Sequence, residues 1–302
     1  MNSVWTLVLA GGDGTRLAPI TRRSDGEVVP KQFCRLTGRR SLLEQTLDRA
    51  DRLSGRSRTV TVVTAKHAHW WRDQLKGRAL DRIVVQEQNR GTAAGVLLPI
   101  AHIAKHDPNA RIIILPSDHH FADEDSFVGS IRKGIEASQG DPEHVLLLGI
   151  VPDTPESDYG WIVPAGPCQD GPAPVARFVE KPSRPEALQL MAEGGLWSPF
   201  VLMGKASTLR DLFALSAPRL LAMVDTRVDE ERCSVHHVNS DMPELDFSRD
   251  ILQAAAQRLR VMAVAPCGWS DIGTPERLKE CLRSRPVSSG AHAALAVFGT
   301  LT

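Results

Sequence analysis

The chain has 302 residues, of which 42% are hydrophobic and 24% are charged, and its 36 Lys and Arg residues balance its 36 Asp and Glu residues. This length is enough for one large α/β domain with a substantial buried core. The formal net charge of zero excludes a global positive field, so we expect neither nucleic acid nor a membrane surface as a partner.

The first half of the chain alternates predicted strands and helices. Buried, apolar strands are expected at residues 4–10, 59–64, 83–86, 111–115 and 145–149. Helices are expected at 41–53, 66–75, 92–106 and 126–138. The first of these helices opens with a capping box formed by Ser41 and Glu44. This alternation predicts an α/β fold with a doubly wound, mostly parallel, Rossmann-like sheet that has helices on both faces.

The pattern changes after residue 149. Proline and glycine become frequent, and the apolar segments shorten to 160–163, 175–180 and 196–203. These segments predict a small antiparallel, substrate-binding subregion beside the parent sheet. Helical patterns return at 184–193, 207–215 and 249–258, followed by a strand at 261–265 and a helix that starts at Pro275.

The five cysteines are odd in number, and none is in a C-x-x-C pair, which argues against a disulfide framework or a zinc site. A strand begins almost at once, without a basic and apolar leader, and no apolar run reaches transmembrane length. We therefore expect a cytoplasmic protein.

Three glycines, Gly11, Gly12 and Gly14, follow the first expected strand and remove side chains where that strand ends. Backbone amides can approach anionic oxygens there, because glycine also permits positive φ. Arg16 and Lys31 add two full positive charges, so the stretch predicts a phosphate site. For a lone glycine turn, the alternative is a tight strand-to-helix connection without a ligand.

Two familiar nucleotide motifs are absent, because Leu17 stands where the dinucleotide fingerprint has its third glycine, and no P-loop sequence occurs. The motif G-G-x-G-T-R-L-x-P from Gly11, followed by P-K-Q-F from Pro30, closely resembles the signature of the sugar-1-phosphate nucleotidyltransferases. Within that family, it is most similar to the mannose-1-phosphate guanylyltransferases.

This resemblance implies an enzyme that converts a nucleoside triphosphate and a hexose 1-phosphate into a nucleotide sugar and pyrophosphate. GTP and mannose 1-phosphate are the favoured substrate pair. The resemblance also implies a nucleotidyltransferase domain over 1–283, with a nucleotide-binding half over about 1–150, a sugar-phosphate-binding half over about 151–283, and a C-terminal tail over 284–302. The oligomeric state stays open, with a homodimer as one alternative.

Two carboxylates are candidate metal ligands. Asp118 follows a buried strand, at the sheet edge where open α/β folds bind ligands, and a carboxylate there can hold Mg²⁺. Asp271 lies far along the chain, and each residue could otherwise be a turn or helix cap. The segments L-P-S-D-H and G-W-S-D-I-G resemble the metal-binding segments of the family. The resemblance implies that Asp118 and Asp271 together bind Mg²⁺ as a cofactor.

Residues 86–94 follow an expected strand and open a helix, a position from which amides can read the edge of a base. The segment resembles the base-recognition segment of the family, although Glu87 and Ala94 stand where proline is usual. The resemblance implies nucleotide contacts from this segment and from the glycine stretch. The implied residues are Gly11, Gly12, Gly14, Thr15, Gln86, Asn89, Gly91 and Thr92.

Residues 178–182 resemble the F-x-E-K-P element, which implies that Glu180 binds sugar hydroxyls and Lys181 the sugar phosphate. Without that context, an exposed Glu-Lys pair is simply a solvated edge. Gly160 is expected to leave room for the sugar ring, and Asp246 is a further pocket candidate. Ser198 stands where the family has Asn, and a hydroxyl in place of an amide changes the sugar contact.

A sugar phosphate is already an anionic nucleophile, so the inferred reaction needs no general base. Catalysis then consists of holding two polyanions in line and neutralising the leaving group. The resemblance assigns this work to Arg16, Lys31 and Lys181.

Three alternatives stay open. The first is a nucleotidyltransferase for another pair of nucleotide and sugar phosphate. The second is a D-x-D glycosyltransferase that uses a metal at Asp123 and Asp125, although their position before a helix also suits capping. The third is a catalytically silent sensor of nucleotide sugars.

Overall fold

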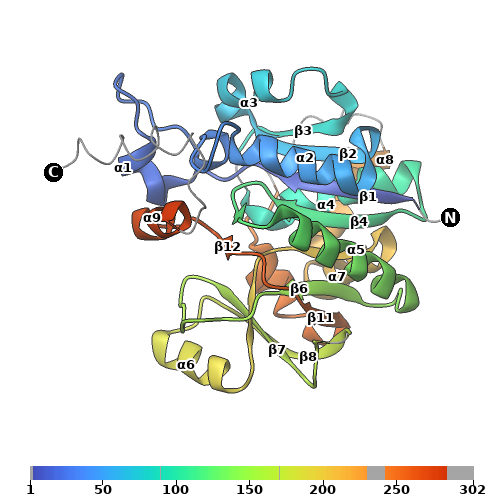
Figure 1. Cartoon of the computed structure of the whole chain (residues 1–302). Helices are drawn as coiled ribbons and strands as arrows, with labels where there is room; N and C mark the ends of the chain where they lie inside the picture. Colours follow the sequence, from blue (N-terminus) through green and yellow to red (C-terminus); the bar gives the residue numbers. More distant parts are fainter. Residues whose placement is uncertain (1–2, 89, 170, 230–241, 284–302) are drawn as a thin grey trace.

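The computed structural model describes residues 3–88, 90–169, 171–229 and 242–283 (Figure 1). Within these residues, ten strands form one sheet in the order β3-β2-β1-β4-β10-β6-β11-β8-β7-β9. Their bounds are Val4–Leu9 (β1), Thr59–Thr64 (β2), Ile83–Gln86 (β3), Arg111–Pro116 (β4), Val145–Gly149 (β6), Gly160–Pro164 (β7), Ala173–Glu180 (β8), Leu196–Ser198 (β9), Leu202–Lys205 (β10) and Leu259–Ala263 (β11). The short strands β5 (His120–Phe121) and β12 (Trp269–Ser270) pair separately.

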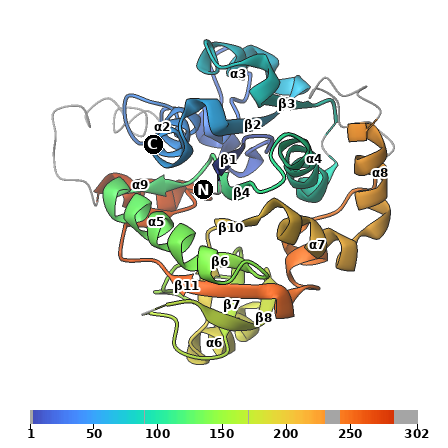
Figure 2. The same cartoon turned by 90° about the vertical axis from the view of Figure 1, so that its right-hand side faces the viewer.

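The strands of the first half, β1 to β4, pair in parallel, and helices cover both faces of the sheet. Figure 2 shows α2 and α5 on one face and α4, α7 and α8 on the other. The bounds of these helices are Leu42–Ser54 (α2), Gly91–His106 (α4), Glu124–Gly140 (α5), Ala206–Ser216 (α7) and Pro218–Asp229 (α8). On β1, Leu7 packs into the core beneath α4, and Val8 into the core beneath α2. The predicted doubly wound sheet is confirmed.

The second half continues the same sheet. β10 lies antiparallel between β4 and β6, and β11 runs parallel to β6. Beyond β11, the strands β8, β7 and β9 pair antiparallel, and α6 (Arg184–Ala192) lies beside them (Figure 1). The predicted antiparallel subregion is therefore present as an extension of the parent sheet.

Several local predictions are confirmed. Ser41 Oγ accepts a hydrogen bond from the backbone of Glu44, whose carboxylate accepts one from the backbone of Ser41, as the capping box requires. A short helix, α3 (Ala68–Gln74), follows β2, and α9 (Pro275–Arg283) begins at Pro275. Of the described helices, none is both long enough and apolar enough to cross a membrane.

Two local predictions are wrong. The apolar run 196–203 is not one strand, because the chain turns at Phe200, which has a φ of 56°, and its two ends join the sheet at different places. The expected helix 249–258 is a π-helix over Phe247–Leu252 followed by a 3-10 turn over Ala256–Arg258. Apolar spacing over so few residues does not distinguish these helix types. The predicted tail, 284–302, lies outside the described residues.

Candidate active site

The glycine loop, residues 11–14, connects β1 to the 3-10 turn Thr15–Leu17. Gly14 has a φ of 61°, and a Cβ there would lie 2.7 Å from the backbone nitrogen of Lys31, so glycine is required. The buried Gln32 donates from Nε2 to the carbonyl oxygens of Ala10 at 3.1 Å and Gly12 at 2.7 Å. These contacts fix the conformation of the loop.

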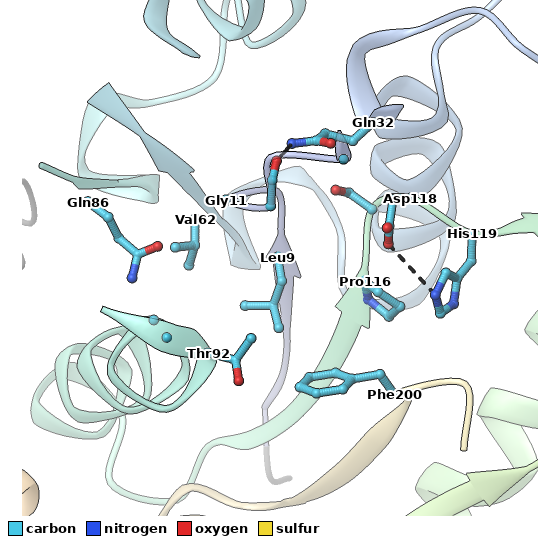
Figure 3. Close-up of a pocket in the computed structure, with 15 residues that line it drawn as sticks. Leu9, Gly11, Gln32, Val62, Gln86, Thr92, Pro116, Asp118, His119 and Phe200 are labelled. Carbon is cyan, nitrogen blue, oxygen red and sulfur yellow. Dashed lines mark hydrogen bonds and ion pairs between the residues drawn. The ribbon is translucent and has the colours of Figure 1, made fainter. Parts of the chain in front are cut away.

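A cavity of about 260 Å³ opens where β1, β3 and β4 end, beside the glycine loop (Figure 3). Gln86, buried at the end of β3, lies between two glycines of its wall. A Cβ at Gly11 or Gly95 would lie 2.9 or 2.8 Å from its side-chain amide. No described residue accepts a hydrogen bond from Gln86 Nε2. An amide donor without a protein partner in a cavity wall is suited to reading a base edge.

The start of α4 forms the neighbouring wall of this cavity. Gly91 has a φ of 76°, and a Cβ there would lie 2.2 Å from the carbonyl oxygen of Leu245. Thr92 Oγ1 already accepts a hydrogen bond of 2.7 Å from the backbone of Phe247. Both residues line the cavity at the positive end of the helix dipole. Thr15 is exposed and does not belong to this lining, and Asn89 lies outside the described residues.

The ammonium of Lys31 is buried between two segments that are distant in sequence. Its Nζ lies 2.9 Å from Asp118 Oδ2 and donates to the carbonyl oxygen of Asp271 at 2.6 Å. Burial alone would raise the pKa of Asp118, but the influence of Lys31 and His119 outweighs it and lowers this pKa to about 2. Asp118 is therefore ionised at neutral pH, and Lys31 is already paired within the protein.

Asp271 is buried, and four groups surround its carboxylate. Tyr159 Oη donates to Oδ1 at 2.8 Å, and the backbone nitrogen of Gly273 donates to the same oxygen at 2.9 Å. Arg277 Nη1 lies 3.1 Å from Oδ1 and 3.3 Å from Oδ2. Arg16 Nη2 lies 3.7 Å from Oδ2. The predicted residues Arg16, Lys31, Asp118 and Asp271 thus meet in one place.

The donor chemistry of this cluster fits Mg²⁺. Asp118 and Asp271 offer hard carboxylate oxygens, the ligands that Mg²⁺ prefers. Burial opposes ionisation of Asp271, but the influence of His119, Arg277 and Lys31 is larger and lowers its pKa. The described residues contain no group of three His, Cys, Asp or Glu side chains that could hold a metal. Two carboxylates completed by phosphate oxygens is the arrangement common at nucleotide sites.

The antiparallel strands bring the predicted sugar-binding residues together. Gly160 on β7 is in register with Glu180 on β8 and with Ser198 on β9. A Cβ at Gly160 would lie 2.8 Å from Glu180 Oε2, so glycine leaves room for this carboxylate. Burial, and then the charge of Asp246, raises the pKa of Glu180. Asp246 Oδ1 itself accepts a hydrogen bond of 2.9 Å from the backbone of Arg249 and caps the π-helix.

Lys181 follows Glu180 and points a largely free charge to solvent. Its side chain is 54% exposed, and its Nζ lies 3.8 Å from Glu180 Oε1. Among the described residues, positive φ outside glycine occurs at Lys181, Phe200 and Ile272. All three adjoin the residues described above, since Phe200 lines the cavity and Ile272 follows Asp271. Strain of this kind concentrates at functional sites.

Sequence reasoning assigns no individual role to three residues that hold the site together: Gln32 and Tyr159, which lie within motifs, and Arg277. Tyr159 is the only tyrosine in the chain and precedes Gly160, so it links the antiparallel strands β7, β8 and β9 to Asp271. A sole tyrosine directly before a glycine that is expected to leave room for a ligand was a signal that the sequence offered. Arg277 lies in the first turn of α9, where the helix dipole disfavours a cation. A cation at the unfavourable end of a helix dipole indicates that a carboxylate partner compensates for its position, and this was the signal for Arg277.

A doubly wound sheet with a glycine loop and a cavity at its strand ends, beside Asp118 and Asp271 joined through Lys31, is typical of nucleotide-binding α/β proteins. The chain belongs to the nucleotidyl transferase family, whose model matches residues 5–284.

Within this family, the chain is similar to enzymes that act on mannose 1-phosphate. It is 28% identical to the mannose-1-phosphate guanylyltransferase of Klebsiella pneumoniae over 286 residues, which cover 91% of this chain and 59% of that protein. The chain thus spans about 59% of the length of this curated relative.

Solved structures agree with the fold. The crystal structure of mannose-1-phosphate geranyltransferase from Thermus thermophilus matches with a TM-score of 0.81 at 29% identity, covering 95% of this chain and 81% of that one. Mannose-6-phosphate isomerase from Helicobacter pylori matches with a TM-score of 0.68 at 19% identity, covering 89% of this chain and 99% of that one. At that identity, the second likeness concerns the fold alone.

Proposed function

We propose that this protein transfers a nucleotidyl group from GTP to mannose 1-phosphate and releases pyrophosphate. One observation carries the proposal: a glycine-lined cavity ends at the Lys31–Asp118 pair, and Tyr159 joins Asp271 to the strands that carry Glu180 and Lys181. These features support separate places for two anionic substrates. The choice of GTP and mannose 1-phosphate is supported by the names of the relatives.

The residues of this chain suit the two substrates in different ways. The unpartnered amide of Gln86 and the start of α4 would hold the base, and the glycine amides and Arg16 would bind the phosphates of the nucleotide. Lys181 would position the sugar phosphate, while Glu180 accepts hydrogen bonds from sugar hydroxyls. Because the attacking phosphate is already anionic, holding the two substrates in line supplies much of the catalysis.

Lys31 differs from the simple phosphate ligand that its motif implies. Its ammonium is already paired with Asp118 and bonded to the carbonyl oxygen of Asp271, so a nucleotide phosphate would compete with these partners. Mg²⁺ held by Asp118 and Asp271 would supply positive charge near the reacting phosphates. Lys31 and Arg16 neutralise further charge on the leaving pyrophosphate.

The D-x-D alternative is less well supported. Asp123 Oδ1 accepts a hydrogen bond of 2.9 Å from the backbone of Ser126 and caps α5. Asp125 pairs with Arg52 of α2 at 2.6 Å. Both carboxylates lie at the start of α5 and have structural partners, the backbone of Ser126 for Asp123 and Arg52 of α2 for Asp125.

A pyrophosphate-release assay tests the proposal. The purified protein is incubated with Mg²⁺, each of four nucleoside triphosphates and a panel of hexose 1-phosphates. We expect release only when both substrates are present, with the highest kcat/KM for GTP and mannose 1-phosphate. Equal release from the triphosphate alone would identify a hydrolase. A higher kcat/KM for another pair would refute the substrate choice and leave the reaction class standing.

A further inference from the structure

Arg277 is held by three neighbours despite its unfavourable position in the first turn of α9. Its Nη1 contacts both carboxylate oxygens of Asp271, and its Nη2 pairs with Glu156 Oε2. The guanidinium carbon lies 4.7 Å from the ring centroid of Tyr159. The side chain is only 18% exposed, so these partners replace most of its contact with water.

The partners of Arg277 come from both ends of the site. Asp271 lies in the segment between β12 and α9, whereas Glu156 and Tyr159 lie just before Gly160 on the sugar side. A Cβ at Gly273 would lie 2.3 Å from Asp271 Oδ2 and 2.9 Å from Arg277 Nη1. The absence of a side chain at Gly273 therefore leaves room for the Arg277–Asp271 pair.

A second arginine, Arg16, forms an ion pair with the same loop before Gly160 and offers a comparison. Arg16 Nη1 lies 3.1 Å from Asp158 Oδ2, but these side chains are 55% and 47% exposed. Exposed ion pairs hold their partners weakly, because water and salt screen the charges. The Arg277–Glu156 pair has side chains that are 18% and 23% exposed, so it constrains the loop more firmly.

We propose that Arg277 is a positioning residue for the transfer reaction: it orients the carboxylate of Asp271 and ties it to Glu156 in the loop that precedes Gly160. Both ends of the site are then set by a single guanidinium fork, whose planar geometry serves two carboxylates at once. The inference rests on the proposed function, since it assigns Arg277 a part in that reaction.

Substitutions at Arg277 test the orientation of Asp271. We expect Arg277→Ala to lower kcat by about 10–100-fold, the usual effect of removing a group that orients a ligating carboxylate. KM for the nucleotide should change little, because Arg277 does not line the cavity. Arg277→Lys should restore little of kcat, because an ammonium lacks the planar fork whose two separate nitrogens contact Asp271 and Glu156. Circular dichroism and thermal unfolding establish that each variant is folded.

Glu156→Gln tests the tie to the sugar side separately. We expect it to raise KM for the hexose 1-phosphate more than it lowers kcat, because the Arg277–Asp271 contact is retained. The matched control is Asp158→Asn, which breaks the exposed pair in the same loop and should alter KM for the hexose 1-phosphate less than Glu156→Gln does. Calorimetric binding of hexose 1-phosphate to metal-free protein provides a readout without turnover, and both Arg277→Ala and Glu156→Gln should weaken this binding.

The outcomes separate this inference from the proposed function. A wild-type protein without turnover for any substrate pair would refute the proposed function and, with it, the inference. An active wild type whose folded Arg277→Ala variant keeps its kcat would refute the inference alone. Full restoration of kcat by Arg277→Lys would also refute it, because any positive charge would then suffice.

Discussion

The proposed nucleotide side of the site (the glycine loop, Lys31 and Asp118) and the proposed sugar side (Gly160, Glu180 and Lys181) present their lysines differently. Lys31 is buried, with its Nζ 2.9 Å from Asp118, whereas the side chain of Lys181 is 54% exposed, with its Nζ 3.8 Å from Glu180. The nucleotide side lies at the ends of parallel strands, in a part of the sheet that helices cover on both faces. The sugar side is built from antiparallel strands. In the proposed reaction, a phosphate would compete with Asp118 for Lys31, whereas at Lys181 it would mainly replace water.

Asp118 on the nucleotide side and Glu180 on the sugar side also differ in how well the surrounding protein stabilises their charge. The pKa of Asp118 is lowered to about 2, because its neighbours outweigh burial, whereas burial and Asp246 raise the pKa of Glu180. The nucleotide side is thus electrostatically satisfied within the protein, while the sugar side holds a carboxylate that is costly to ionise. We expect the nucleotide side to contribute to folding and the sugar side to be specialised for binding.

The largest effect is expected from the carboxylates near Lys31. Asp118→Asn and Asp271→Asn should each lower kcat by about 10³-fold, the scale for removing one preorganised electrostatic group. If both carboxylates hold the same Mg²⁺, the double variant should be little worse than the worse single variant. Steady-state kinetics with and without EDTA measures this effect. Activity that survives EDTA, or losses that multiply fully, would contradict a shared metal.

Asp123→Ala and Asp125→Ala are the controls for this experiment. Asp123→Ala should cost about 1 kcal/mol of unfolding free energy, because it removes the cap of α5. Turnover by both variants should stay near the wild-type rate. A loss comparable to that of Asp118→Asn would favour the D-x-D alternative.

The next effect compares the two lysines directly. Lys181→Ala should lower kcat/KM for the hexose 1-phosphate by about 10²-fold, with unchanged nucleotide binding and an unchanged Tm. Lys31→Ala should lower both kcat and Tm, because Asp118 loses its ionic partner. Kinetics, calorimetry and thermal unfolding measure the three quantities. Lys181→Ala protein with weakened nucleotide binding and normal sugar-phosphate binding would overturn the assignment of Lys181.

The pH dependence should have opposite signs on the two sides. The folded-state pKa of Asp118 is lowered from 3.8 to about 2, so the stability that it contributes is present above pH 3.8 and is lost as the pH falls towards 2. The folded-state pKa of Glu180 is raised above 4.5, so its carboxyl group stays protonated to a higher pH in the folded protein than in the unfolded chain. Relative to Glu180→Gln, the wild type should lose stability as the pH rises from 4.5 through that raised value.

Activity should follow the ionisation of Glu180, because only the carboxylate accepts hydrogen bonds at both oxygens. We expect kcat/KM for the hexose 1-phosphate to fall at acidic pH, as Glu180 takes up its proton. The Glu180→Gln variant should lack this fall and have a lower plateau. If kcat/KM falls at the same acidic pH in both proteins, the fall is caused by another group, such as the substrate phosphate.

The smallest effect concerns Ser198, which offers the sugar one hydroxyl. Ser198→Asn should sharpen the preference among hexose 1-phosphate epimers by about 0.5–1.5 kcal/mol, the net value of one hydrogen bond. Ser198→Ala is the matched control and should not sharpen that preference. Ratios of kcat/KM across the epimers measure the effect. Unchanged ratios in Ser198→Asn would place this residue outside the sugar contact.

The parallel half of the fold was predictable because its signals are local. Buried strands read as unbroken apolar runs, and Ser41 marks the start of α2 through contacts within one turn. The second half was less predictable, because a single apolar run, 196–203, supplies two strands that lie apart in the sheet. The two strands are separated by residues 199–201, which include the backbone turn at Phe200. The sequence does mark this break, because Ser198 and Pro199 interrupt the apolar run and a proline cannot donate to a strand ladder.

The site shows the same limit. Motifs identified Lys31, Asp118 and Asp271 one by one, but their mutual contacts depend on the fold. Tyr159 and Asp271 are 112 positions apart, so no local pattern reports their hydrogen bond. Lys31 likewise carries the right charge for a phosphate, and only the structure shows that a carboxylate already neutralises it.

Strand β10 limits how the molecule can move around its substrates. It hydrogen-bonds to β4 on one side and to β6 on the other, so the backbone ladder is unbroken across the two halves of the chain. A hinge between those halves would have to break the ladder and expose Leu202 and Met203, both fully buried. Bending of the sheet between β4 and β6 is therefore unfavourable, so we expect this part of the sheet to be a rigid frame while substrates bind. Slow amide exchange in β10 is the signature of such a frame.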